Sequence, residues 1–398
     1  MRKKKILIAQ GGGPTMVINQ SLVGLFRYAQ KNSLDVYGAL NGVRGIVESN
    51  FVNLNNISKE KAEIIAKTPS SILGSTRDKP DNNYCNEILR VLKQQKISSF
   101  FYIGGNDSSD SLRIISEKSQ QENYNLDCIH IPKTIDNDLV YNDHTPGFGS
   151  AAKYVAMAFS GIDLDVRSLP GIYIGVVMGR HAGFLAAASA LLKKKNDDGP
   201  HLIYTPEMVF DLKKFYNDVK ITYEKLGRCV IAVSEGIQDY KKKLIAHYAT
   251  KNLLEKDSHG NIQLSGTGSL GDYLANQIRN NLKINRVRAD TFGYMQRSFL
   301  GCASEVDQKE ARLIGQKALT YSLKIKRSFS ISIIPRREYS LPYSVQFGIN
   351  NLSDIAAKTK LLSKVFINKK ENFVTKEFVN YAKPLIGKKI PQFTNSIK

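Results

Sequence analysis

The sequence predicts an α/β fold made of two similar doubly wound domains, each with a mainly parallel sheet. Short runs rich in β-branched residues alternate with amphipathic helical patterns along most of the chain. Several of these runs end in glycine or polar residues, at the point where a strand would pass into a helix. Because parallel strands need a crossover connection, usually a helix, this alternation indicates repeated βαβ units.

The expected strands and helices follow one another in chain order. Each strand is a short run of β-branched or aromatic residues, and each helix repeats apolar residues every three or four positions. Strands are predicted at residues 6–9, 35–40, 99–105, 128–131, 171–179, 201–206, 229–236 and 329–334. Helices are predicted at residues 16–30, 83–95, 108–118, 150–159, 183–194, 214–225, 272–281 and 305–322.

Three segments are expected in a chain of 398 residues, which is long enough for two or more cores. Pro146 and Gly147 interrupt the pattern after a charged cluster and before a helix. We therefore predict a first α/β domain at residues 1–147 and a second at residues 148–296. Residues 297–398 are too irregular for a third domain and are expected to return over both domains.

The composition is that of an ordinary globular protein, with 42% apolar and 23% charged residues. No window reaches the ~18 unbroken apolar residues of a membrane span. The short apolar run after the basic start leads into a glycine turn instead of a signal-peptide cleavage site. The four cysteines show no spacing typical of zinc or of a disulfide framework. We therefore expect a cytoplasmic protein without a membrane segment, a disulfide or a structural zinc.

The chain is basic, with a formal net charge of +21, which favours anionic partners. Nucleic acid, a membrane surface and phosphorylated metabolites all fit that description. The lysines are scattered among polar segments, and the sequence has no continuous basic block or RNP-type aromatic run, so nucleic-acid binding is not expected.

Residues 132–138, PKTIDND, are the most informative segment of the chain. They place a lysine, a hydroxyl, two carboxylates and an amide directly after an apolar strand, where open α/β sheets bind ligands. Asp136 and Asp138 alternate, so one of these carboxylates can face a substrate and accept a proton. Lys133 and Thr134 could hold phosphate oxygens beside it. A polar loop held by Asx turns is the structural alternative.

Two further strands end in glycine turns that suit phosphate. GGGPT at 11–15 precedes a helical pattern, and its backbone N–H groups and the helix dipole would favour an anion. A plain tight turn explains it equally well, since it is neither a Walker A loop nor a full GxGxxG. YIGGNDSSD at 102–110 places Asn106 and Asp107 at a helix start, where they can cap the helix or serve a hydrated Mg²⁺.

The second half of the chain also carries charged groups at strand ends. They are Arg180 in VVMGRHAGF, Glu235 in SEG, and Arg288, Tyr294 and Arg297 in RADTFGYMQRS. The arginines could clamp a sugar phosphate through bidentate hydrogen bonds, although a surface ion pair is the commoner fate of an arginine.

GTGSLG at 266–271 matches the GxGxxG pattern of dinucleotide sites, and Asp290 lies near the spacing of a ribose-binding acid. The preceding NIQLS is a poor buried strand, so a glycine turn before a helix is the favoured interpretation. The histidines form no HExxH or other metal-binding pair, and a catalytic metal held by histidine is not expected.

Taken together and in order, eight segments resemble the phosphofructokinase family, especially its pyrophosphate-dependent members. They are GGGPT at 11–15, LGSTR at 73–77, GGNDS at 104–108, PKTIDND at 132–138, HTPGFGSA at 144–151, MGRHAG at 178–183, SEG at 234–236 and GYMQR at 293–297. The resemblance implies an enzyme of two α/β domains with its active site in the cleft between them. It also implies pyrophosphate-dependent phosphorylation of fructose 6-phosphate to fructose 1,6-bisphosphate, a reversible step of glycolysis that uses Mg²⁺.

The resemblance assigns roles to the matching positions. Asp136 would be the general base, supported in catalysis by Lys133, Asp107 and Arg180. Gly12 would belong to the pyrophosphate loop, and Asn106 would bind Mg²⁺. Fructose 6-phosphate would be held by Thr134, Ile135, Met178, Gly179, His181, Glu235, Arg288, Tyr294 and Arg297.

Donor choice in the family depends on two positions. ATP-dependent relatives typically have glycine where this chain has Asp107 and Lys133, so the side chains would fill the space of the nucleotide, and the lysine would complement pyrophosphate. The chain also departs from the family. Asn106 replaces an aspartate that binds Mg²⁺ in many relatives, Gly171 replaces an arginine that reaches across a subunit interface, and Ser298 replaces a glycine.

Two alternatives stay open within the same family. An ATP-dependent 6-phosphofructokinase would be identified by nucleotide competition. A non-catalytic sugar-phosphate-binding paralogue would bind fructose 6-phosphate without turnover. The resemblance suggests a homodimer or homotetramer, with pyrophosphate and fructose 6-phosphate as ligands and neither nucleic acid nor a membrane as partner.

Overall fold

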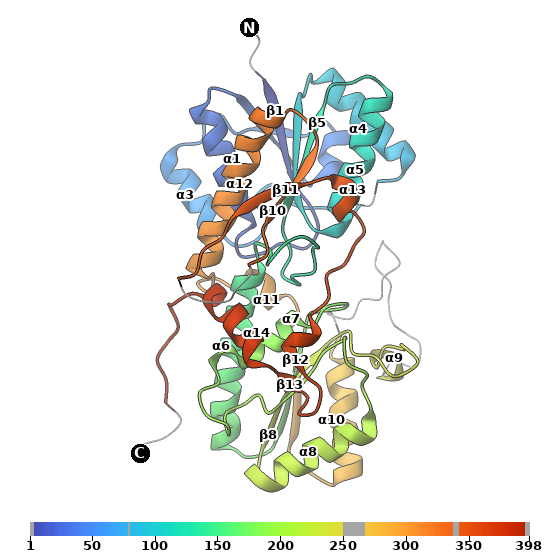
Figure 1. Cartoon of the computed structure of the whole chain (residues 1–398), viewed down its shortest axis with the longest axis vertical. Helices are drawn as coiled ribbons and strands as arrows, with labels where there is room; N and C mark the ends of the chain where they lie inside the picture. The colour runs from blue at the N-terminus through green and yellow to red at the C-terminus, as the bar shows by residue number, and fades with distance from the viewer. Residues whose placement is uncertain (1–3, 79, 250–266, 337–341, 395–398) are drawn as a thin grey trace. The chain divides into compact units, whose positions relative to one another are not determined.

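The structure is a computed structural model that describes residues 4–78, 80–249, 267–336 and 342–394 (Figure 1). The chain forms two compact units. Unit 1 consists of Met1–Ser150 and Arg297–Lys360, and unit 2 consists of Ala151–Gln296 and Leu361–Lys398. The residues after position 296 are thus shared between the two units.

Unit 1 is built on a seven-stranded sheet in the order β11-β10-β5-β4-β1-β2-β3. The strands are β1 (Lys5–Gln10), β2 (Asp35–Ala39), β3 (Phe51–Asn53), β4 (Ser99–Gly104), β5 (Asp127–Pro132), β10 (Phe329–Ile333) and β11 (Phe347–Asn350). The five inner strands run parallel, and the edge strands β3 and β11 are antiparallel to their neighbours. Strands β4 and β5 are buried along their whole length, as expected for parallel strands covered on both faces.

Helices cover both faces of this sheet. The helices of unit 1 are α1 (Ile18–Lys31), α2 (Val43–Val47), α3 (Lys59–Lys67), α4 (Asn82–Gln94), α5 (Asn106–Gln121), α12 (Glu305–Ile325) and α13 (Leu352–Ile355). Ile6 and Ile8 of β1 pack in the core under α1, α3 and α12, whereas Leu7 and Ala9 pack in the core under α4 and α5. Alternate residues of one strand therefore serve opposite cores, which follows from the two-residue period of a strand.

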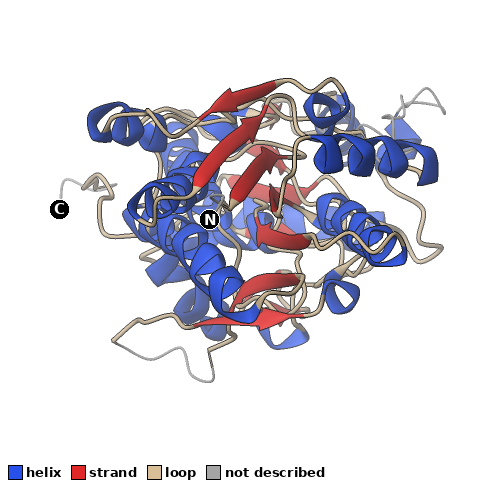
Figure 2. Ribbon diagram, turned by 90° about the horizontal axis from the view of Figure 1, so that it is seen from above, coloured by secondary structure: helices blue, strands red, loops and turns tan. Residues whose placement is uncertain are grey.

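Unit 2 has a smaller, fully parallel sheet in the order β7-β8-β6-β9. Its strands are β6 (Ile172–Val177), β7 (Leu202–Tyr204), β8 (Cys229–Ser234) and β9 (Val287–Thr291). Its helical segments are α6 (Phe148–Ser168), which begins at the end of unit 1, α7 (Phe184–Ala188), η1 (Ser189–Leu192), α8 (Leu212–Leu226), α9 (Ala246–Ala249), α10 (Ser269–Leu282), α11 (Met295–Ser298), whose last two residues belong to unit 1, η2 (Lys364–Phe366), α14 (Lys376–Ala382) and η3 (Lys383–Ile386). Strands β12 (Ile367–Asn368) and β13 (Phe373–Val374) form a separate antiparallel pair. Figure 2 shows the helices and strands of the described chain in two colours.

The α/β class and the mainly parallel sheets predicted from the sequence are confirmed. Each of the eight predicted strands overlaps an observed strand. The sequence did not predict β3, β9 and β11, which are edge strands with partly exposed residues and no continuous apolar run, or the two-residue strands β12 and β13. It also predicted one helix at 183–194, where the structure has the short helix α7 followed by a 3-10 turn.

The GxGxxG match lies partly outside the described residues, as does the NIQLS segment before it. Within the described part, Gly268 directly precedes α10, so a glycine turn before a helix is present there.

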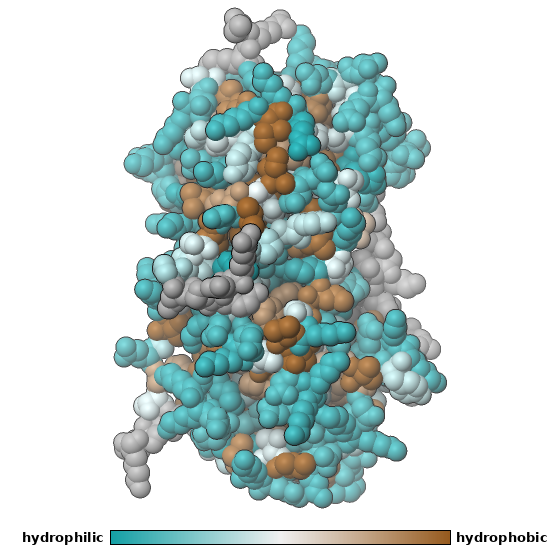
Figure 3. Space-filling view, viewed as in Figure 1, coloured by the Kyte–Doolittle hydropathy of each residue, from teal (hydrophilic) through white to brown (hydrophobic). Residues whose placement is uncertain are grey.

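The visible molecular surface is mainly hydrophilic, with small apolar areas (Figure 3). The exposed large apolar side chains come from many elements, among them Ile64 of α3, Ile221 of α8 and Leu300 after α11. Within the described ranges, no helix combines the length and the apolar character needed to cross a bilayer.

Candidate active site

Three neighbouring strands of unit 1 end in the glycine and polar segments that the sequence singled out. Strands β5, β4 and β1 are adjacent and parallel, with Gly104 paired to Pro132 and Ile103 paired to Gln10. Their carboxyl ends therefore lie at one edge of the sheet, where open α/β sheets bind ligands. The loops that meet there are residues 11–13 after β1, 105–107 after β4 and 133–136 after β5.

The loop after β1 requires glycine because other groups approach its backbone closely. A Cβ atom at Gly11 would collide with the hydroxyl group of Tyr102, and Gly12 has a φ of +72°, in the left-handed region. The Gly11 amide donates to the Ile103 carbonyl, and the Gly12 amide donates to the Thr76 carbonyl. These amides are thus already engaged, so the positive charge for an anion has to come mainly from side chains.

The expected helix start is also farther from this loop than the sequence suggested. Helix α1 begins at Ile18, five residues after Gly13, and its N-cap Val17 offers no side-chain hydrogen bond. The macrodipole effect is strongest within the first turn of a helix. The dipole of α1 therefore contributes less at the glycine loop than a directly following helix would.

Lys133 supplies a buried positive charge at the glycine loop. Lys133 is 2% exposed, and its Nζ donates to the carbonyl of Gly13 at 2.6 Å. The Arg297 guanidinium carbon lies 3.0 Å from the position that a Cβ of Gly13 would occupy. Burial, followed by the charges of Arg297 and Arg77, lowers the pKa of Lys133 to about 7, although Asp136 and Asp138 oppose this shift. A bound polyanion would relieve this cationic crowding, so the cluster favours phosphate.

The loop after β5 places two carboxylates on either side of a tight turn. The Asp136 amide donates to Oγ1 of Thr134 at 3.1 Å, and Asn137 has a φ of +58°, a conformation that asparagine tolerates. Burial, followed by the charge of Asp136, raises the pKa of Asp138 to about 7. A pair of nearby carboxyl groups can therefore hold one proton near neutral pH, which suits acid–base chemistry.

Asn106, the predicted metal ligand, offers one oxygen at the same sheet edge. Its Nδ2 donates to Oδ2 of Asp138 at 3.2 Å, while its Oδ1 is buried and accepts no hydrogen bond. Among the described residues, no three His, Cys, Asp or Glu side chains are grouped as a complete metal cage. Mg²⁺ needs only one or two protein oxygens when phosphate and water supply the rest. The donor set therefore fits a magnesium ion that arrives with its phosphate ligand.

The predicted sugar-phosphate residues of unit 2 follow two neighbouring strands. Val177 of β6 pairs with Ser234 of β8, so Met178 and Gly179 lie beside Glu235. The Ser234 hydroxyl donates to the Gly179 carbonyl at 2.5 Å. Met178 and Glu235 are buried, whereas His181 is exposed and Arg180 is half-buried. The structure thus brings the MGRH and SEG segments together at one edge of the smaller sheet.

Arg288 lies at the other end of this sheet. It pairs with Tyr173 near the start of β6, five residues before Met178, which corresponds to about 16 Å along a strand. The side chain of Arg288 is exposed, and Tyr294 is 53% exposed. Gly171 lies at the same end of the sheet, where an added Cβ would meet Arg286. Within one chain, Arg288 is therefore separated from the MGRH and SEG segments.

Ile135 is 5% exposed, so its apolar side chain belongs to the protein interior and only its backbone is available to a ligand. Asp107 is exposed in the first turn of α5. Arg167, four positions before Gly171, forms ion pairs with Asp163, Asp197 and Asp198, so its guanidinium is engaged within unit 2.

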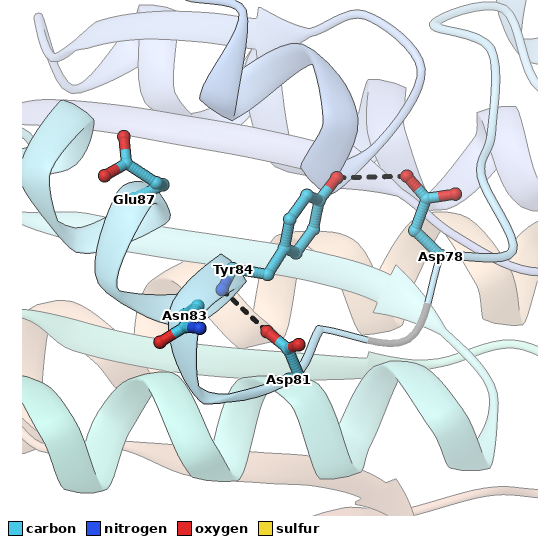
Figure 4. A pocket seen from close by; sticks show the side chains of 5 residues that line it. All are labelled: Asp78, Asp81, Asn83, Tyr84 and Glu87. Carbon is cyan, nitrogen blue, oxygen red and sulfur yellow. Dashed lines mark hydrogen bonds between the residues drawn. The ribbon is translucent and has the colours of Figure 1, made fainter.

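An acidic pocket of about 410 Å³ opens in unit 1, lined by Asp78, Asp81, Asn83, Tyr84 and Glu87 (Figure 4). The Tyr84 hydroxyl donates to Asp78, and Asp81 caps helix α4 by accepting the Tyr84 amide at 2.8 Å. Hydrogen bonding from Arg44 lowers the pKa of Asp78, which keeps this carboxylate charged. Asp78 follows Thr76, whose carbonyl accepts the Gly12 amide, by two residues.

Sequence reasoning gave no individual role to three residues that touch the predicted site. Thr76 accepts the Gly12 amide, and Arg77 contributes to the lowered pKa of Lys133. Lys360 donates to Oδ1 of Asn137, although it lies 223 positions later in the sequence. LGSTR at 73–77 was available as a family segment, whereas no signal in the sequence marks Lys360.

Cations beside a glycine loop, together with a carboxylate that can take up a proton, are what a phosphoryl-transfer protein needs. The chain belongs to the phosphofructokinase family, whose model matches residues 5–321.

Similar proteins narrow this assignment. The chain is 54% identical over 393 residues to a pyrophosphate–fructose 6-phosphate 1-phosphotransferase of Rhodospirillum rubrum, covering 98% of this chain and 96% of the relative. It is 35% identical to the protein of the same name from Xanthomonas campestris, covering 98% of this chain and 93% of the relative. The crystal structure of a pyrophosphate-dependent phosphofructokinase from Marinobacter aquaeolei superimposes with a TM-score of 0.85 at 30% identity, covering 98% of this chain and 94% of that chain.

Proposed function

We propose that this chain transfers a phosphoryl group from pyrophosphate to the 1-hydroxyl of fructose 6-phosphate, forming fructose 1,6-bisphosphate and phosphate in a reversible reaction. The observation that most strongly supports this proposal is the position of Lys133, whose buried ammonium lies at the glycine loop beside Arg297. The names of the relatives from Rhodospirillum rubrum and Xanthomonas campestris support the same reaction. The chain is a phosphotransferase enzyme of the phosphofructokinase family.

Asp136 is the general base in this proposal. Its carboxylate accepts the proton of the sugar 1-hydroxyl while that oxygen attacks the nearer phosphorus of pyrophosphate. The bond from this phosphorus to the bridging oxygen breaks, and inorganic phosphate leaves with the electron pair. In the reverse direction Asp136 returns the proton to the sugar oxygen. The neighbouring Asp138 has a pKa raised to about 7. It is therefore partly protonated near neutral pH and adds less than a full negative charge beside the donor.

Pyrophosphate is held at the glycine loop by Lys133. Its ammonium neutralises the charge of the donor near Gly12 and Gly13, where Lys133 approaches the backbone closely. Asn106 would bind Mg²⁺ through Oδ1, because this buried oxygen accepts no hydrogen bond from the protein. When bound with the phosphates, the ion would neutralise charge that develops during transfer.

Two features favour pyrophosphate over ATP as the donor. The Lys133 Nζ lies 3.4 Å from the position of a Cβ at Gly12, so it fills space beside the donor loop that a longer polyphosphate chain would need. Asp107, exposed in the first turn of α5, carries a side chain where ATP-dependent relatives typically have glycine, so it would fill space that a nucleotide needs.

We assign fructose 6-phosphate recognition to residues at the positions that the family resemblance names. Thr134, the Ile135 backbone, Met178, Gly179, Arg180, His181, Glu235, Tyr294 and Arg297 form this set. Arg180 and Arg297 supply charge for the sugar phosphate, and Glu235 accepts hydrogen bonds from sugar hydroxyls. Met178 and Gly179 are held by the Gln296 side chain and the Ser234 hydroxyl, which fixes the loop that carries Arg180.

Arg288 fits this set only if the enzyme is a homo-oligomer. It lies about 16 Å along the sheet from Met178, too far for both to contact one sugar phosphate within the same chain. We propose a homodimer or homotetramer in which Arg288 serves the site of a second copy. The proposed enzyme acts in the cytoplasm, where both substrates are soluble metabolites.

A coupled assay of the purified chain with fructose 6-phosphate and Mg²⁺ tests the function. Pyrophosphate is supplied in one reaction and ATP in the other, and Asp136→Asn serves as the matched control. Product with pyrophosphate alone is the expected result. Product with ATP would overturn the donor assignment. No product with either donor, together with calorimetric binding of fructose 6-phosphate, would identify a binding paralogue.

A further inference from the structure

The catalytic turn at Asp136 is an irregular segment that needs an external anchor. No regular strand or helix is assigned between the end of β5 at Pro132 and the start of α6 at Phe148. Asn137, directly after Asp136, adopts a left-handed backbone with φ of +58°. Asparagine adopts this region more readily than most residues, and the surrounding contacts determine whether it does so. The contacts that hold Asn137 therefore decide where the Asp136 carboxylate points.

Lys360 makes those contacts. Its Nζ donates to Oδ1 of Asn137 at 3.1 Å and to the carbonyls of Asn142 and Asp143 at 2.9 and 3.0 Å. Its backbone amide donates to the carbonyl of Asp138 at 2.7 Å. The three donors of the ammonium thus bond to both ends of one loop. The backbone amide of Lys360 adds a fourth bond, to Asp138 directly after Asn137.

The far end of the loop is fixed to the central sheet. The Asp143 amide donates to the Ile333 carbonyl at 2.8 Å, and Oδ1 of Asn142 accepts the Ile333 amide at 3.1 Å. Ile333 is the last residue of β10, which is buried throughout. Lys360 therefore ties the turn after Asp136 to a rigid strand through Asn142 and Asp143.

We propose that Lys360 is a positioning residue that orients the Asp136 carboxylate for proton transfer. This inference rests on the proposed function, in which Asp136 is the base. Lys360 contacts Asn137, Asp138, Asn142 and Asp143, the residues that follow Asp136 in this loop. These contacts act on the geometry of the turn.

The chemistry of the lysine supports this role. Desolvation lowers the pKa of Lys360 to about 8, while Asp143 and Asp138 favour its charged form. A partly desolvated ammonium is maintained because it satisfies three acceptors that would otherwise lose their partner. Asp138 thereby receives a backbone bond from Lys360 and a side-chain bond from Asn106, so its position is fixed from two directions.

The test compares three variants of the full chain. Lys360→Met keeps the length of the side chain but removes its donors, Lys360→Arg keeps a charged donor, and Lys358→Met is the control, because Lys358 is exposed in the same segment. For Lys360→Met we expect kcat to fall by about 10²-fold, since small displacements of a catalytic group have effects of that size. The KM values for both substrates should stay within about threefold, and Lys360→Arg should recover part of the loss.

Amide hydrogen exchange supplies a readout that does not depend on turnover. In Lys360→Met, exchange should accelerate in residues 133–143 and remain unchanged in α1, α4 and β4 of the same unit. Equal kcat in Lys360→Met and Lys358→Met would overturn the proposal. Accelerated exchange throughout unit 1 would also overturn it, because it would show a general structural role. If the wild type has no activity, the proposed function fails, while the exchange comparison still tests whether Lys360 holds the turn.

Discussion

The loops at the carboxyl ends of the two sheets differ in how their polar groups are held. In unit 1, Lys133, Asn106 and Lys360 each bond to a residue far away in the sequence, and these bonds converge on the loop after β5. In unit 2, the side chains of Gln296 and Ser234 bond to the backbone of Met178 and Gly179 in the MGRH loop, while His181 and Tyr294 are exposed. In unit 1 the polar side chains themselves are thus fixed by contacts, whereas in unit 2 the backbone of the loop is fixed and some of the proposed sugar-phosphate ligands lie at the surface.

Replacing Asp136 is the most direct test of this difference between the two units. Asp136→Ala should lower kcat by about 10²- to 10⁴-fold, the contribution of a general base. Fructose 6-phosphate should still bind, since most of its proposed ligands lie elsewhere. Steady-state kinetics and calorimetry measure the two quantities separately. Retention of more than a tenth of the wild-type kcat would show that another group accepts the proton.

A pair of variants separates the two sets of loops. Lys133→Met should reduce kcat/KM for pyrophosphate by about 10²-fold, because it removes a charge-assisted contact to the donor. Arg180→Met should instead raise KM for fructose 6-phosphate by about tenfold or more through the loss of a similar contact on unit 2. Initial rates at varied concentrations of each substrate distinguish these effects. If each variant affected the other substrate more, the assignment of the two loops would have to be exchanged.

The buried ion pair of His144 tests the stability of unit 1. His144 lies between Asp143 and Glu310, with nitrogen–oxygen distances of 2.8 and 2.7 Å, and Tyr343 donates to Glu310. Although burial opposes it, the charge of Glu310 and the hydrogen bonds that the imidazole donates to both carboxylates raise the pKa of His144 to about 9. Glu310→Gln should lower the free energy of unfolding by about 2 kcal/mol at pH 6.5.

The stabilisation of unit 1 by a charged His144 should depend on pH. A pKa raised above the unfolded value of 6.5 stabilises the folded state fully at lower pH, and this stabilisation is lost as the pH rises through about 9. Denaturant melts between pH 6.5 and 9.5 should therefore show the wild type and Glu310→Gln converging at high pH. A difference that grows with pH would contradict a charged His144.

The smallest expected effect is that of replacing Asn106, the proposed Mg²⁺ ligand. Asn106→Leu removes the buried Oδ1 without adding charge, and the Mg²⁺ concentration needed for half-maximal rate should rise by about tenfold. Asn106→Asp should lower that concentration, because a carboxylate is a stronger ligand for Mg²⁺ than an amide. Rates measured against free Mg²⁺ at saturating pyrophosphate test both. An unchanged Mg²⁺ requirement in Asn106→Leu would exclude Asn106 as a ligand.

Much of the fold could be predicted because its central strands are short, continuous apolar runs. β1, β4 and β5 of unit 1, and β6 and β8 of unit 2, were located because burial on both faces leaves a strong signal. Edge strand β9 was missed because its buried and exposed residues alternate with charges, as in Arg288 and Asp290. The parallel order of neighbouring strands then explains why the loops at 12, 106 and 133 come together.

The contacts that fix the site could not be predicted from local patterns. His144 meets Glu310, and Asp307 accepts the amides of Gly147 and Ser150 at the start of α6, across about 160 positions of sequence. Lys360 contacts the loop after β5 only because the chain returns to it 223 positions after Asn137. Burial determines such polar pairs, since a buried charge or amide must find a partner wherever the fold provides one.

The central claim is that the buried Lys133 and the neighbouring Asp107 select pyrophosphate. It is tested most directly by the ratio of kcat/KM for pyrophosphate to kcat/KM for ATP in the wild type and in the double variant Asp107→Gly/Lys133→Gly. The account predicts a ratio far above one in the wild type that falls by at least about 10²-fold in the variant, mainly through loss of pyrophosphate activity. An unchanged ratio, or a wild type that prefers ATP, would contradict it.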